Sequence, residues 1–558
     1  MKEVCAQIKC VESEMDLFED PGSFEVADRA AHGVFGSASG RCDGAPTNRL
    51  CTVDSGYDRL NGMAVQSAIA VRVRRYDLKR WGVPLKPFDP CAEAKGEVAF
   101  SGETPESRRV PLRRWSVMVR NARELLLDRL QKRPAVVARA KAALSRRPLP
   151  PGELDPPLDL IEKGDRSALL KRAARLGPIF KGTDYDELCI CIIGLARCRR
   201  FLSAHVADLR VSTMEVDRMV PKGFLCQMEG EDHLHYRRAT ARAVRGAEVV
   251  ANQHDLERIA EEGLAAYAAA ATEHGNAPEA FAASVSAIAT GMLTRLFLGA
   301  ETGSNGYDRF NAHFRELGPY GLVWNPQKRQ EVAYKAFRDD VATEVELIRS
   351  GRSSLAESSL LAQTLVDGTL DETALGNLIY RAEMGRSDIK NLFRWLTRHV
   401  TDDPSILDRV ADEQSVGVKG PRSVAEAFVL ETLRTDQSER LMRRATNEIV
   451  FEGFLIPRNA MVRLCMWESH HDSATFDDPH RFDPQRFLED MPSNDRYAPF
   501  GVDHHQCPMG GISIQIGTIF VNALARHYSV KRLAEGPPVR GAYHWEPSPR
   551  FAVELVDR

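Results

Sequence analysis

The sequence lacks any uninterrupted apolar run of about 18 residues, the minimum for a membrane-spanning helix. Its N-terminus lacks the apolar core of a signal peptide. It also lacks a strong charge of either sign, because 75 Lys and Arg residues nearly balance 78 Asp and Glu residues. Such a balance favours neither nucleic acid nor a membrane surface as a partner. We therefore expect a cytoplasmic protein that spans no membrane and binds no nucleic acid.

No Cys-x-x-Cys pair occurs in the sequence, and its 11 cysteines are an odd number. This pattern excludes the disulfide framework of a small secreted protein. The apolar stretch around Cys189, Cys191 and Cys198 favours positions in the core over metal binding. We interpret His470 and His471 as an ordinary surface or loop pair.

The 558 residues are 43% hydrophobic, enough for a large buried core and for more than one folding unit. Charge is uneven along the chain, because residues 101–150 contain 13 Lys and Arg against 4 Asp and Glu. Proline-rich sequence, which closes helices and stiffens linkers, follows this basic segment. We predict an N-terminal extension of unknown role over 1–150, with a basic helical linker at about 105–150, and a main domain over 151–558.

The main domain is predicted to be mainly α with a small β portion. Six stretches show apolar residues at helical spacing: 255–271, 280–298, 332–349, 372–400, 424–433 and 512–527. Residues 445–466 alternate instead and contain Gly453 and Pro457, which favours short strands and turns. We therefore expect a large helical domain with a little β-structure late in the chain.

The loop 498–511 carries the clearest chemical signal. Cys507 lies in this glycine-rich loop immediately before a predicted helix, whose unpaired amide groups would stabilise a thiolate. A thiolate in this position is a plausible ligand for a soft or borderline metal or for heme iron. A zinc site formed by His504, His505 and Cys507 is disfavoured, because adjacent histidines point in different directions and no fourth ligand is nearby.

Phe500, Gly501, His505 and Cys507 together resemble the cysteine-loop signature of the cytochrome P450 superfamily, in its soluble bacterial type. Two glycines of that signature are replaced here, by Asp503 and Met509. The resemblance implies heme b (iron protoporphyrin IX) as cofactor, with Cys507 as the axial iron ligand and Phe500 among the cofactor-binding residues.

Further motifs of the same family follow in the expected order. Glu431 and Arg434 resemble its Glu-x-x-Arg pair, and Arg486 in the next meander would complete a buried structural triad. The resemblance also implies contacts to the heme propionates, from His233, Arg237, Arg443 and His505. It covers about 160–558 and implies a cytochrome P450 fold plus an N-terminal extension.

The segment that matches the family's central helix departs from the pattern. Family members usually carry an acid followed by an alcohol, which deliver protons to dioxygen; here Ser387 and Asp388 stand in swapped order. In one reading, both still relay protons in a monooxygenase. In a second, a one-residue bulge places Arg386 and Ser387 over the heme for a peroxide-driven reaction. In a third, the protein does not activate dioxygen and catalyses an oxidative cyclisation, a rearrangement or a nitrene-like transfer.

The resemblance implies a heme-thiolate oxidoreductase that acts on a small-molecule, natural-product intermediate. Its electrons would come from a ferredoxin or flavodoxin, because the chain has no flavin or nicotinamide fingerprint of its own. Arg386 and Arg440 suggest a polar or acidic substrate. A non-catalytic partner role is a second alternative, although Cys507 argues against it. The Arg- and Ala-rich composition is typical of a bacterial source.

Overall fold

The computed structural model describes residues 147–558, except for residues 185, 213–218, 248, 319–327, 438–439 and 542–543. The chain divides into two units, residues 1–137 and 138–558, and every described residue belongs to the second unit. The predicted extension and its basic linker lie almost wholly outside the described residues. Their boundary near residue 150 therefore stays a prediction.

Helices dominate the described unit, as predicted. The α-helices are α7 (Leu158–Gly164), α8 (Ala168–Leu176), α9 (Leu195–Ala204), α10 (Gly230–Gly246), α11 (Val249–His274), α12 (Pro278–Leu298), α13 (Asn305–Leu317), α14 (Lys328–Arg349), α15 (Leu360–Val366), α16 (Glu372–Asp402), α17 (Ser405–Val416), α18 (Val424–Thr432), α19 (Met466–His470) and α20 (Gly510–His527). Short 3₁₀ or π turns occupy Val206–Asp208, Leu433–Gln437 and Pro484–Phe487. Each of the six predicted helical stretches coincides with one of these helices.

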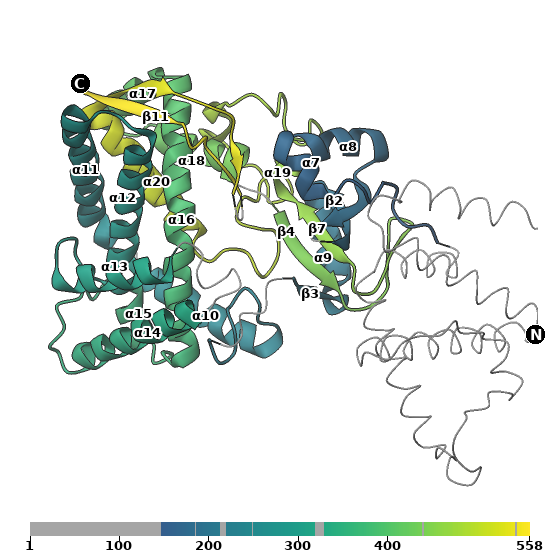
Figure 1. Cartoon of the computed structure of the whole chain (residues 1–558), viewed down its shortest axis with the longest axis horizontal. Helices are drawn as coiled ribbons and strands as arrows, with labels where there is room; N and C mark the ends of the chain where they lie inside the picture. The colour runs from purple at the N-terminus through teal and green to yellow at the C-terminus, as the bar shows by residue number, and fades with distance from the viewer. Residues whose placement is uncertain are drawn as a thin grey trace, which may run out of the picture. The chain divides into compact units, whose positions relative to one another are not determined.

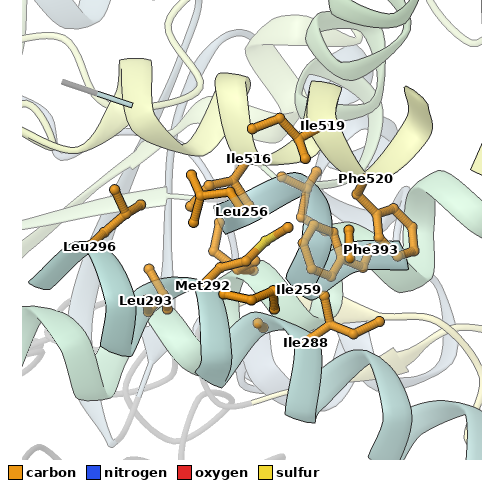
Figure 2. Packing of buried hydrophobic residues seen from close by; sticks show 14 of the residues in the cluster. Leu256, Ile259, Ile288, Met292, Leu293, Leu296, Phe393, Ile516, Ile519 and Phe520 are labelled. Atoms are coloured by element: carbon orange, nitrogen blue, oxygen red, sulfur yellow. The ribbon is translucent and has the colours of Figure 1, made fainter. Parts of the chain in front are cut away.

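The main core lies where α11, α12, α16 and α20 pack together, on the helical side of the unit (Figure 1). Side chains from these helices interdigitate there, among them Met292 of α12 and Ile516 of α20 (Figure 2). Phe393 of α16 stacks on Phe520 of α20 with ring centroids 4.1 Å apart. Gly517 allows α18 to approach α20, because a Cβ there would lie 3.0 Å from Val429. Close packing of this kind fixes α16 as a rigid support.

One described helix, α12, is long and apolar enough to cross a membrane by length and composition. In the fold, 72% of its most apolar window is buried inside the protein. It packs between α11 and α16, and a helix that is apolar on every side is typical of such a core position.

Strands form earlier in the chain than we predicted. They are β1 (Ile179–Asp184), β2 (Glu187–Ile193), β3 (Leu209–Val211), β4 (Arg440–Ala445), β5 (Ile449–Phe451), β6 (Phe454–Ile456), β7 (Met461–Cys465), β8 (Tyr528–Ala534), β9 (Val539–Arg540), β10 (Trp545–Glu546) and β11 (Ala552–Asp557). The largest sheet has the order β1-β2-β7-β4-β3, so it joins early strands to late ones. The expectation of β-structure only late in the chain was wrong, because β2 is covered on both faces and its continuous apolar sequence does not alternate.

Burial corrects one histidine interpretation and supports the cysteine one. Cys189, Cys191 and Cys198 are buried, as predicted. His470 and His471 are buried too, so the surface interpretation was wrong. Burial lowers the pKa of His471 to about 3, which keeps its ring neutral. His470 joins α19 to the loop that leads to Cys507, since it accepts the backbone N–H of Ala498, whereas His471 stacks on Trp467.

Candidate functional site

The loop that carries Cys507 folds back on itself before α20 begins. The backbone N–H of Cys507 donates to the carbonyl of Phe500 at 2.8 Å, which closes the loop. Gly501 adopts a φ of 104°, a left-handed conformation that side chains rarely allow. Gly510 leaves room for the Phe500 ring, because a Cβ there would lie 2.8 Å from that ring. These glycines explain why this stretch forms a compact loop directly before a helix.

The Cys507 side chain faces an internal space. It is exposed to solvent, yet burial by the surrounding protein raises the pKa of its thiol. A side chain that is both accessible and surrounded lines a space inside the molecule. The backbone N–H of Met509 opposes the effect of burial and lowers that pKa, as do the charges of Arg237 and Arg381.

Helix α16 supplies the opposite wall of this space. Asp388 and Arg381 are seven residues apart, which is two helical turns, so they share one face. The charges of both residues act on the Cys507 thiol. Burial raises the pKa of Asp388 and lowers that of Arg381 to about 10. Arg381 donates to the hydroxyl of Thr240 on α10 at 2.6 Å, so α10 and α16 meet at this wall.

Two buried histidines have ring nitrogens without a hydrogen bond. His233 of α10 is 2% exposed, and its Nε2 has no hydrogen-bond partner. Both ring nitrogens of His505 are likewise buried without a hydrogen bond, although Nε2 lies 3.5 Å from Glu229 Oε2, and the two histidine rings lie 4.4 Å apart. Burial, followed by the charges of His505 and His504, lowers the pKa of His233 to about 4. Buried polar atoms that lack a partner are costly, so they point to a ligand.

Two arginines join this histidine pair. Arg443 of β4 donates to Asp503 Oδ2 at 2.5 Å, and Arg237 of α10 donates to the carbonyl of Gln506. Burial alone would raise the pKa of Asp503, but Arg443 outweighs burial and lowers it. A cavity of about 290 Å³ opens beside Arg443, Asp503 and His505. A larger cavity, of about 780 Å³, lies between the α7–α8 turn and residues 537–541 and does not contain Cys507.

The donor set of this space matches a heme. Heme b presents an iron atom, which a thiolate can bind, and two carboxylate groups at one edge. Cys507 provides the thiol, and His233, His505, Arg237 and Arg443 gather donors near one another. The orphaned nitrogens of the two histidines are the groups that such carboxylates would satisfy.

A family model described as Cytochrome P450 matches residues 419–541, which include Glu431, Arg434 and Cys507. The fold agrees: retinoic acid-bound cyanobacterial CYP120A1 is similar, with a TM-score of 0.59 and 19% sequence identity, over 74% of this chain and 100% of that one. Residues 419–541 are thereby identified as part of a cytochrome P450 domain. Cytochromes P450 bind heme through a cysteine thiolate, so this protein is a heme-thiolate oxidoreductase.

Plant enzymes are among the similar proteins of known name. Abscisic acid 8'-hydroxylase 2 of Oryza sativa subsp. indica is 24% identical over 417 residues, which cover 68% of this chain and 81% of that protein. Ent-kaurenoic acid oxidase 1 of Arabidopsis thaliana is 25% identical over 451 residues, which cover 72% and 90%. The recognition of a cytochrome P450 enzyme with a heme cofactor is thereby confirmed, whereas the soluble bacterial type stays a prediction.

The predicted structural triad comes together behind the cysteine loop. Arg434 donates to both carboxylate oxygens of Glu431, at 2.7 and 2.8 Å, and both side chains are fully buried. Arg434 also donates to three backbone carbonyls, and Glu431 accepts the backbone N–H of Asp483. Arg486 lies 3.6 Å from Glu431 and is partly exposed. The chain itself therefore satisfies Glu431 and Arg434, whereas the Nε of Arg486 is buried without a hydrogen bond.

The three predicted residues of the central helix point to different places. Asp388 lines the internal space, and Ser387 is buried at 8% exposure. Arg386 lies over the Phe314 ring at 4.3 Å and donates to the Phe314 carbonyl, so it packs against α13. Helix α16 is α-helical from Glu372 to Asp402, without the bulge that would turn Arg386 toward the heme.

Sequence reasoning missed several residues of the site. Arg381 could have been found, because it lies two helical turns before Asp388 on the same face. His544 could not have been found in this way, because it lies in the C-terminal segment, far from Asp388 in the sequence, and belongs to no recognisable motif. Glu229, with His504 and His505, forms a group whose ligand atoms lie within 4.8 Å of one another. Cys507 is not part of that group.

Proposed function

We propose that the protein is a monooxygenase that oxidises a small, polar or acidic natural-product intermediate, with Cys507 as the axial ligand of its heme. The observation that carries this proposal is the position of Cys507. Its thiol is solvent-accessible yet surrounded by protein, the charges of Asp388, Arg237 and Arg381 act on it, and Arg237 also acts on His233. When bound, the heme supplies the oxidation chemistry, and the protein supplies the ligand, the orientation and the protons.

The residues around the heme edge hold it in place. His233, His505, Arg237 and Arg443 would donate hydrogen bonds to its carboxylates. Phe500 closes the cysteine loop, and the backbone N–H of Met509 stabilises the thiolate of Cys507. This assignment needs no rearrangement of the backbone, because the loop is already closed around Gly510.

Asp388 is the residue that would deliver protons on the far side of the heme. It stands where the family usually has an alcohol, and it faces the same space as Cys507. Burial raises its pKa, so the carboxyl group holds a proton more readily than an exposed aspartate does. Ser387, which is buried at the preceding position of α16, would take part in the same proton relay.

The names of the relatives agree with an acidic substrate. Two relatives are named for abscisic acid and ent-kaurenoic acid, and the similar solved structure contains retinoic acid. Arg386 would have to turn away from Phe314 to pair with a substrate carboxylate, and its Nε, which is buried without a hydrogen-bond partner, is the atom that such a group would satisfy. Arg440 begins β4, and its side chain lies outside the described residues. An Arg386→Ala variant that binds candidate acids as tightly as the parent would contradict this role.

We further propose that a ferredoxin or flavodoxin supplies electrons and that the protein works in the cytoplasm of a bacterium. The sequence carries no flavin or nicotinamide fingerprint that could replace such a donor. Reconstitution with purified ferredoxin, flavodoxin and cytochrome P450 reductase compares the donors directly. Product formation with the reductase alone would contradict this part of the proposal.

The decisive experiment is the absorption spectrum of the reduced protein with bound carbon monoxide. We expect the red-shifted Soret band of a thiolate-ligated heme in the parent and its loss in Cys507→Ser. Cys226→Ser is the matched control, because Cys226 also lies close enough to Arg381 for their charges to interact. A band at the position of neutral-ligand hemes, or one that survives in Cys507→Ser, would overturn the proposal and favour the non-catalytic alternative.

A second function is favoured by the swapped order of Ser387 and Asp388. A carboxylate in place of the alcohol could serve a reaction that does not activate dioxygen, such as a peroxide-driven oxidation, a cyclisation, a rearrangement or a nitrene-like transfer. Turnover driven by a ferredoxin should be compared with turnover driven by hydrogen peroxide. Product from peroxide alone, unchanged in Asp388→Asn, would favour this second function.

A further inference from the structure

The C-terminal segment brings a histidine to the carboxylate of α16. His544 Nδ1 lies 3.9 Å from Asp388 Oδ1, within ion-pair range and longer than a direct hydrogen bond. On the other side of the ring, His544 Nε2 lies 3.2 Å from the amide nitrogen of Asn391. His544 is 6% exposed and Asn391 is fully buried, so protein surrounds both. These contacts form a continuous chain from Asn391 through His544 to Asp388.

The Asn391 amide favours one tautomer of His544. With the amide nitrogen of Asn391 facing the ring, that nitrogen donates and His544 Nε2 accepts. The ring proton then resides on Nδ1, which is the atom that faces Asp388. A histidine held in one tautomer by a neighbour on one side can orient a reacting group on the other.

The segment that carries His544 is attached firmly to α16. Trp395 donates to the carbonyl of Trp545 at 3.1 Å, and Arg394 donates to the carbonyls of Pro547 and Ser548 at 3.1 and 2.8 Å. Both donors are buried residues of the helix that also carries Asp388 and Asn391. The position of His544 is thus built into the fold and does not depend on a mobile surface loop.

We propose that His544 is a positioning residue for Asp388 and that Asn391 fixes the His544 ring for this role. His544 orients the carboxylate toward the space in front of Cys507 and holds it in the ionised form between proton deliveries. The proton moves on and off a carboxylate oxygen of Asp388, and no bond of His544 is broken. This inference rests on the proposed function, since it assigns a role to the carboxylate of the heme-facing wall.

Four charged or titratable groups act on Asp388 besides burial. His544 and Lys390 lower its pKa, and Glu546 raises it. Cys507, on the opposite wall, interacts with the same carboxylate. Glu546 in turn lies 3.9 Å from Arg394. Because His544 and Glu546 act in opposite directions from the same segment, their variants should move the titration of Asp388 in opposite directions.

The test is a pH titration of the ferrous carbon-monoxide complex, followed by the infrared band of the bound carbon monoxide. This band reports the charge near the heme, and it needs no substrate. We expect one transition between about pH 4 and pH 9 that is absent in Asp388→Asn. In His544→Phe the transition should move to higher pH by about one pH unit, because a partner of the ionised form is lost. His544→Gln, which keeps a donor, should restore part of the difference.

Three further variants complete the test. Asn391→Leu should shift the transition less than His544→Phe and in the same direction, whereas Glu546→Gln should shift it to lower pH. His527→Phe is the matched control, because His527 is exposed on α20 and pairs with Glu261. We expect no shift there.

The outcomes separate this inference from the proposed function. If the reduced carbon-monoxide complex lacks the red-shifted Soret band, the proposed function fails. If the band is present but His544→Phe leaves the transition unchanged, or the parent shows no transition, the role of His544 is overturned. If only Asn391→Leu leaves the transition unchanged, the role of Asn391 is overturned.

Discussion

Two groups of buried charges in this protein differ in how they are satisfied. Behind the cysteine loop, Glu431 and Arg434 direct their polar atoms at each other and at nearby backbone groups. In front of it, His233 and His505 keep buried nitrogens without a hydrogen bond. Burying a polar group without a partner costs about 1–3 kcal/mol, so the nitrogens of these two histidines are candidates for a ligand that satisfies them. Glu431 and Arg434 therefore stabilise the fold, whereas His233 and His505 are placed to bind the heme.

The largest expected effect comes from breaking the satisfied group. Arg434→Met removes five hydrogen bonds and leaves Glu431 buried without its cation. We expect the free energy of unfolding, measured by urea denaturation, to fall by about 3–5 kcal/mol. Arg481→Met, an exposed arginine of the same meander, is the control and should cost less than about 1 kcal/mol. A loss for Arg434→Met as small as that of the control would contradict the comparison.

The opposite pattern is expected for the unsatisfied group. His233→Leu removes a buried nitrogen that has no partner in the heme-free protein. We expect the unfolding free energy of the heme-free protein to stay the same or rise, while heme dissociates roughly 10-fold faster or more. Heme transfer to apomyoglobin measures this rate. His235→Leu, an exposed neighbour on α10, should change neither quantity.

A third prediction concerns acid stability. Burial alone would raise the pKa of Asp436, but hydrogen bonds from His399 at 2.6 Å and Arg166 at 2.7 Å outweigh it and lower that pKa below the ordinary 3.8. A lowered folded-state pKa stabilises the protein above the unfolded value and loses that contribution as pH falls. We expect Asp436→Asn to be less stable than the parent near neutral pH, with a difference that shrinks below about pH 4.

This prediction is checked by urea denaturation of both proteins at several pH values. Asp402→Asn is a control, because Asp402 is partly exposed and pairs with Arg532 at the surface. Its cost should be small and should vanish at high salt. If the unfolding free energies of Asp436→Asn and the parent differ by the same amount at every pH, Asp436 stabilises the protein through packing and not through its charge.

The smallest effect is expected at the edge of the satisfied group. Arg486 lies 3.6 Å from Glu431 and 15% of its side chain is exposed, so water shares in satisfying it. We expect Arg486→Gln to lower the unfolding free energy by about 1 kcal/mol or less. A cost as large as that of Arg434→Met would make Arg486 a full member of the buried group and sharpen the predicted triad.

The sequence predicted the local patterns well. The helices over 372–400 and 512–527 were visible because a helix that buries one side shows apolar residues at helical spacing. The cysteine loop was visible because short-range motifs survive two glycine replacements. The early strands β1 and β2 were missed, because a strand buried on both faces carries no alternation.

Other features depend on contacts that sequence spacing does not encode. The sequence suggested that His470 and His471 lie at the surface, but both are buried in the folded protein. Arg386 and Asp388 are two residues apart, yet helical geometry sends one to Phe314 and the other to the internal space. Adjacent positions on a helix differ by about 100°, so a register argument without a packed neighbour cannot choose between their surroundings.

By itself, the sequence determined the family, the cysteine loop and the helical character of the main domain, because these depend on residues close together in the chain. Only the tertiary structure decided what surrounds each charge. His544 lies beside Asp388 although more than 150 positions separate them in the sequence. Arg434 has hydrogen-bond partners within the fold, whereas the Nε2 atom of His233 has none. The physical reason is that the pairing of a buried polar group depends on which distant segments pack around it.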